Sequence, residues 1–139
     1  MRFNNSILDS ARLQSRAYAE AEKIFSKEST RGGRTLEQIR RSCLIGHAAE
    51  LYLIDHCNFR DDTRDYKDVF NTEGEPVEVK VTQKKKDVTF VLKRCNAAAL
   101  ETFRNYPKIL YIFIVNDYNG DYELHGIYHW NGKEFVNDN

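Results

Sequence analysis

A short stretch of the chain predicts a β-hairpin that carries acidic and basic side chains on one face. Along residues 77–82, valine alternates with Glu78, Lys80 and Thr82, and this period of two is typical of a half-buried strand. The valines therefore take one face of the strand, and Glu78 and Lys80 share the other. A carboxylate and an amine side by side can bind a cation and orient a water molecule for hydrolysis.

The turn of the hairpin sets the register of its strands. A three-residue loop that ends at Gly74, where positive φ is needed, places Asp68 of a first strand over residues 66–71 opposite Glu78. Their Cβ atoms are then about 5 Å apart, and facing like charges destabilise a sheet. A divalent cation between them reverses the sign of the interaction, because hard oxygen ligands suit Mg²⁺ or Mn²⁺. The alternatives are a solvated face with chance charges, and Asp65 in place of Asp68.

A long helix is predicted over residues 35–57, where Thr35 and Gln38 form a capping box. At about 100° per residue, Glu50 falls in the middle of the helix's apolar stripe. A carboxylate there is costly unless it is paired or binds a metal, so we expect Glu50 to point across at the carboxylate face of the hairpin. The alternative is a Glu that reaches water or pairs with an arginine. Gly46 on the same stripe predicts a close approach of helix and sheet.

In order and spacing, these residues resemble the motif of the PD-(D/E)xK nuclease superfamily, the fold of many restriction enzymes and junction resolvases. Glu50 matches the family's acidic helix residue, Asp68 matches its strand Asp, and Glu78-Val79-Lys80 matches its (D/E)-x-K triplet. Lys67 stands where the motif has its Pro. The resemblance covers roughly residues 35–117.

The resemblance implies an α/β (α+β) fold with a restriction-endonuclease-like core. We expect a mixed central sheet flanked by helices, in the order α-α-β-β-β-α-β-β. Residues 1–139 would form a single domain with its core at about 35–117, the N-terminal helix and the C-terminal strands being additions. The elements outside the long helix and the hairpin are expected as a helix from Asn5 or Ser6 to about Lys27, a strand over 88–93, a helix from Asn96 to before Pro107, a strand over 109–115 and a strand over 122–130.

The resemblance also implies a metal-dependent endonuclease that cleaves DNA with Mg²⁺ (or Mn²⁺). The catalytic residues would be Glu50, Asp68, Glu78 and Lys80, and the metal ligands would be Asp68, Glu78, the Val79 carbonyl and Glu50. Lys80 would orient or activate the attacking water, or stabilise charge on the phosphate. Two alternatives stay open: a catalytically inactive nuclease-fold module that binds nucleic acid or acts as an inhibitor, and a structural protein whose motif is accidental.

The formal net charge is zero, which argues against strong, indiscriminate nucleic-acid binding. Basic residues nevertheless cluster near the start of the long helix and just after the triplet, where they would hold a phosphodiester backbone. The candidate nucleic-acid-binding residues are Arg34, Arg40, Arg41, Gln83, Lys84, Lys85 and Lys86. A solvated basic loop is the alternative for the lysines, and RNA stays open as a substrate beside DNA.

Length and composition set the remaining expectations. A chain of 139 residues is short for an enzyme that must cut two DNA strands, so a homodimer is the natural way to gain a second site. We see no signal peptide and no apolar run long enough to span a membrane. Three unpatterned cysteines fit a reduced cytoplasmic compartment, and the small size suits a phage or prokaryotic context.

Overall fold

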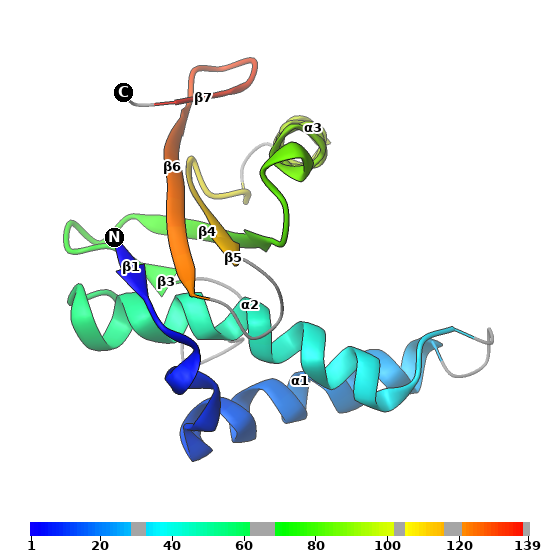
Figure 1. The fold of residues 1–139 in the computed structure, drawn as a ribbon. Helices are drawn as coiled ribbons and strands as arrows, with labels where there is room; N and C mark the ends of the chain where they lie inside the picture. The colour runs from blue at the N-terminus through cyan, green and yellow to red at the C-terminus, as the bar shows by residue number, and fades with distance from the viewer. Residues whose placement is uncertain (29–32, 62–68, 102–104, 116–120, 138–139) are drawn as a thin grey trace.

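A curled mixed sheet separates two layers of helices (Figure 1). The computed structural model describes residues 1–28, 33–61, 69–101, 105–115 and 121–137. In this mixed α+β fold, α1 (Ala11–Glu28) and α2 (Leu36–His56) lie on one side of the sheet, and α3 (Val88–Glu101) lies on the other. Within the described ranges, no helix combines the length and the apolar character needed to cross a membrane.

The described strands form one sheet in the order β1-β6-β5-β4-β3-β2, with β7 paired to β6. β4 and β5 run parallel, and the other described pairs are antiparallel. A parallel pair needs a crossover connection, and α3 lies in the segment that joins β4 to β5. The strands are β1 (Arg2–Phe3), β2 (Arg60–Asp61), β3 (Val69–Phe70), β4 (Pro76–Thr82), β5 (Ile109–Val115), β6 (Tyr122–Trp130) and β7 (Phe135–Asn137).

The hairpin between β3 and β4 has the predicted turn and register. Val69 lies opposite Val77, and the Asn71 amide donates a hydrogen bond of 2.9 Å to the Glu75 carbonyl. Gly74 closes the loop with φ of +80°, a conformation that only glycine adopts without strain. The predicted pairing of residues 75 and 71 is therefore confirmed.

The capping box at the start of α2 is also confirmed. The Gln38 amide donates to Thr35 Oγ1 at 3.2 Å, and the Thr35 amide donates to Gln38 Oε1 at 2.8 Å. At the N-terminus the structure differs from the prediction of one helix beginning at Asn5 or Ser6. A 3₁₀ turn over Asn5–Asp9, capped by Asn4, precedes α1, which begins only at Ala11.

The prediction of a strand over residues 88–93 is wrong, because this segment is the first half of α3. Val88, Cys95 and Ala99 are buried at helical spacing against the sheet, and this period of 3.6 prevails over the β propensity of the valines. Asn96 therefore does not cap a helix; its side chain accepts a hydrogen bond of 2.8 Å from the Phe135 amide. The described strands between α2 and α3 are β2, β3 and β4.

β5 is buried on both faces, as its continuous apolar sequence predicts. Ile109, Phe113 and Val115 pack with the core on the α2 side of the sheet. Leu110 and Ile112 pack with the separate core beneath α3. Because β4 runs parallel to β5 and its residues pair with it one to one, β5 also fixes which side of the sheet each β4 side chain takes.

Candidate functional site

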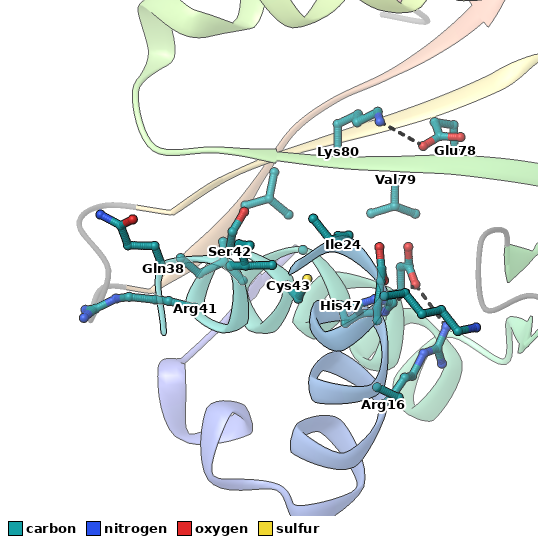
Figure 2. A pocket seen from close by; sticks show the side chains of 18 of the residues that line it. Arg16, Ile24, Gln38, Arg41, Ser42, Cys43, His47, Glu78, Val79 and Lys80 are labelled. Carbon is teal, nitrogen blue, oxygen red and sulfur yellow. Dashed lines mark hydrogen bonds and ion pairs between the residues drawn. The ribbon is translucent and has the colours of Figure 1, made fainter. Parts of the chain in front are cut away.

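An open hollow of about 1090 Å³ lies between α1, α2 and β4 (Figure 2). Glu50 of α2 lines it, and so do Glu78, Val79 and Lys80 of β4. The helix carboxylate and the strand triplet therefore border one common space. Asp68, the remaining predicted catalytic residue, lies outside the described residues.

The β4 side chains that reach this hollow point to opposite sides of the strand. Val79 points toward the helices, whereas Glu78 and Lys80 point away from them (Figure 2). Lys80 Nζ lies 3.2 Å from Glu78 Oε1. The prediction that these two side chains share one face of the strand is therefore confirmed. Glu78 and Lys80 pair with β5 residues that face the core beneath α3, whereas Glu50 approaches the hollow from the α2 side. The prediction that Glu50 points at the carboxylate face of the hairpin is therefore wrong for Glu78, because the valines of β4 take the face that packs on α2 (Figure 2).

Glu50 is held by a buried arginine. The exposed fraction of Glu50 is 9%, and Arg16 Nη2 of α1 lies 3.0 Å from Glu50 Oε2. The other terminal nitrogen of Arg16 lies 2.8 Å from Asp61 Oδ2, at the end of β2. The alternative of a Glu paired with an arginine is therefore realised, and the pairing compensates a carboxylate that burial alone would make costly.

His47, one turn before Glu50, joins the same group of charges. Its Nδ1 lies 3.3 Å from Glu50 Oε2, and its Nε2 hydrogen-bonds to the carboxylate of Glu20 on α1. Burial alone would lower the pKa of His47, but the hydrogen bonds and charges of Glu20 and Glu50 raise it to about 9. Burial raises the pKa of Glu50, against the opposing effects of His47 and Arg16. We call Arg16, Glu20, His47, Glu50 and Asp61 the ionic cluster.

The stability of the protein should fall as the pH rises from about 6.5 to 9. The folded protein binds a proton at His47 over this interval and the unfolded chain does not, because the pKa moves from 6.5 to about 9 on folding. Linkage then lowers the free energy of unfolding by up to about 3 kcal/mol over this interval. Urea denaturation at pH 6 and at pH 9.5, both in EDTA, measures this difference. His47→Gln should flatten the pH dependence; an equal dependence in both proteins would contradict the assignment.

Sequence reasoning found Glu50 but missed its partners. His47 could have been noticed because it precedes Glu50 by one helical turn. Arg16 and Glu20 are likewise one turn apart on α1, beside small buried residues that let α1 and α2 come close. Asp61 carries no such signal, since only the fold brings it to Arg16.

The predicted nucleic-acid-binding residues do not all line one surface. Arg34, Arg41 and Gln83 line the same hollow as Glu50. Arg40 does not line it: its guanidinium lies 3.3 Å from Glu22 and 3.2 Å from Glu37.

The lysines after β4 lie elsewhere. Lys84 and Lys85 line a second hollow of about 510 Å³, which Gln83 also borders, between the end of β4 and the beginning of β6. Lys86 is exposed within the 3₁₀ turn Lys85–Asp87. The three lysines therefore do not extend the surface around Glu50.

The prediction that Gly46 permits a close approach of α2 to the sheet is wrong. A Cβ atom built on Gly46 would meet no atom within 4 Å. Gly46 lines the hollow instead, so its missing side chain leaves space there rather than bringing two elements into contact.

The donor atoms around the triplet suit a hard divalent cation. Glu78, which lines the hollow beside Val79, carries a carboxylate, and Mg²⁺ and Mn²⁺ prefer such oxygen ligands. The Glu78 side chain is only 17% exposed, so it is already partly removed from water. Among the described residues, no three His, Cys, Asp or Glu side chains gather as a metal-binding group; Asp68 falls outside them.

Searches among protein-family models, curated proteins and solved structures found no match to this chain.

Proposed function

We propose that this protein is a metal-dependent endonuclease that hydrolyses phosphodiester bonds in DNA, on a restriction-endonuclease-like core. One observation supports this most: Glu50 from α2 and the triplet Glu78-Val79-Lys80 from β4 border one open hollow. These are residues that the family motif requires at one site. The hollow also receives Arg34 and Arg41, whose positive charges suit a phosphate backbone.

Glu78, the Val79 carbonyl and Asp68 would hold Mg²⁺ or Mn²⁺. When bound there, such a cation polarises the scissile phosphate and lowers the pKa of a water molecule. Lys80 supplies the mobile positive charge of the site: its side chain is 45% exposed and its ammonium touches Glu78. From this position it orients the attacking water or donates to a phosphate oxygen as negative charge develops.

Glu50 contributes a fixed carboxylate on the other side of the hollow. Arg16 and His47 restrict it from two directions, so its oxygens are held at a defined place rather than moving freely. Such support from neighbouring groups is how a site keeps a ligand or a bound water in position. Glu50 would bind a second cation or hold a metal-bound water in place.

Incubation of supercoiled plasmid with the purified protein tests this proposal. We expect nicking or linearisation in Mg²⁺ and in Mn²⁺, none in EDTA, and none by a Glu78→Ala variant in any condition. The variant controls for a contaminating nuclease, since it passes through the same purification. Absence of cleavage by the natural sequence on supercoiled, nicked and branched DNA alike would contradict the proposal.

The second candidate is a catalytically inactive nuclease-fold module that binds nucleic acid. The engagement of Glu50 Oε2 with both Arg16 and His47 favours it, because a carboxylate oxygen bound by two cations is a poorer metal ligand. Titration calorimetry with Mn²⁺ separates the two candidates. Heat of binding that disappears in Glu78→Ala supports the enzyme, and no heat in either protein supports the module.

A further inference from the structure

The charges that line the hollow between α1, α2 and β4 are mixed at one end. There the carboxylates of Glu20, Glu50 and Glu78 lie with the cations of Arg16, His47 and Lys80. At the other end, Gln38 and Arg41 lie away from Arg16 and His47, with Cys43 and Ile24 between them (Figure 2). Four exposed cationic side chains line the hollow: Lys23, Lys27, Arg34 and Arg41. The pKa of Glu20 is lowered chiefly by its hydrogen bond to His47 and also by the charge of Lys23, so Lys23 lies near the ionic cluster. We call these four cations the basic row.

Three cations of the basic row lie on two helices, and Arg34 comes just before α2. Lys23 and Lys27 follow each other on α1, about 6 Å apart along the axis at the helical rise of about 1.5 Å per residue. Arg41 stands on α2 across the hollow. A single phosphate group is recognised by donors that converge on one point. A row of separated cations suits a chain of phosphates, as in a nucleic-acid backbone.

The length of the hollow fits such a chain. Arg41 and Glu50 are about 14 Å apart along α2, again from the helical rise. This distance equals the axial rise of about four phosphates of one DNA strand. Gln38 and Ser42 are exposed beside Arg41 and line the same hollow; neutral donors of this kind commonly contact phosphate oxygens.

We propose that Lys23 and Lys27 of α1, together with Arg34 and Arg41, bind the backbone phosphates of a DNA strand and lead it along the hollow toward Glu50 and Glu78. This inference rests on the proposed function and names the path of its substrate. It gives α1, which lies before the nuclease-like core at residues 35–117, a direct part in DNA binding. It also separates this path from Lys84 and Lys85, which border the other hollow.

Binding without cleavage tests the path. A fluorescein-labelled DNA duplex of about 20 base pairs, titrated in EDTA and followed by fluorescence anisotropy, compares the natural sequence with Lys23→Gln/Lys27→Gln. The matched control is Lys93→Gln/Lys133→Gln, which removes the same charge from two exposed lysines that do not line the hollow. Thermal melting of all three proteins verifies that they are equally folded.

We expect the Lys23/Lys27 variant to bind on the order of tenfold or more weakly at 0.1 M salt, while the control binds normally. The slope of log affinity against log salt should decrease by about 2, one for each lost phosphate contact. Equal affinities of the two variants would overturn the inference, and so would a natural sequence that binds no duplex. Selective weakening of the Lys23/Lys27 variant without any plasmid cleavage would support the path and contradict only the nuclease.

Discussion

Replacement of Arg16 by methionine should lower the free energy of unfolding by about 3–5 kcal/mol. Arg16 is 7% exposed and contacts the carboxylates of Glu50 and Asp61 at 3.0 and 2.8 Å. Methionine fills most of the same space, so the expected effect is electrostatic: two acids lose their shared cation while they remain largely removed from water. Of the two carboxylates, Asp61 should be destabilised more by the loss of Arg16, since its Oδ1 has no hydrogen-bond partner among the described residues.

Urea denaturation at pH 7 measures this loss, and Arg12→Met is a matched control one turn earlier on α1. Arg12 also forms an ion pair, at 2.9 Å from Asp55, but its side chain is 59% exposed. Exposed pairs of this kind contribute less than about 1 kcal/mol. Glu50→Gln in the Arg16→Met background should recover part of the loss, because it removes one of the isolated charges. Equal losses for Arg12→Met and Arg16→Met would contradict this account of the ionic cluster.

The parts of the fold that were predictable are those decided by neighbouring residues. The capping box of α2 needs only Thr35 and Gln38, and the hairpin register needs only a loop that ends at Gly74. β5 was predictable as a strand buried on both faces because Ile109–Val115 is a nearly continuous apolar run. Each of these signals lies within a few positions of the structure it specifies.

Two wrong predictions, the strand over residues 88–93 and the start of the N-terminal helix, arose where two local signals compete. Residues 88–93 contain valines that favour a strand, but Val88 also begins a helical repeat that continues to Ala99. A window limited to six residues hides that repeat, and the packing of α3 on the sheet decides the outcome. The start of α1 is a similar case, since Asn4 caps a 3₁₀ turn before the helix proper begins.

The candidate site was predictable from one side only. Alternation along β4 placed Glu78 and Lys80 together, and the apolar stripe of α2 drew attention to Glu50. The partner of Glu50 could not be identified, because Arg16 is on another helix and the pair forms only when α1 packs on α2. Which face of β4 meets the helices was equally hidden; burial of the valines under α2 decides it.

Glu78→Gln should lower the rate of DNA cleavage on the order of 10³-fold or more in Mg²⁺. The amide keeps the size of the side chain but removes the negative charge that would hold a cation, and about 4 kcal/mol of transition-state stabilisation corresponds to this factor. Lys80→Met should lower the rate by about 10²- to 10³-fold, as for the loss of one group that stabilises developing charge. Both side chains are at least partly exposed, so neither variant should unfold the protein.

Glu73→Gln and Lys133→Met are the matched controls, because both residues are exposed in turns and neither lines the hollow. Single-turnover cleavage of a labelled duplex by all five proteins, with thermal melting of each, separates chemistry from folding. Normal rates in the controls and slow rates in the two site variants would assign the reaction to Glu78 and Lys80. If a folded Glu78→Gln protein cleaves at the full rate, the carboxylate is not needed for the chemistry, and the assignment of the site to β4 is wrong.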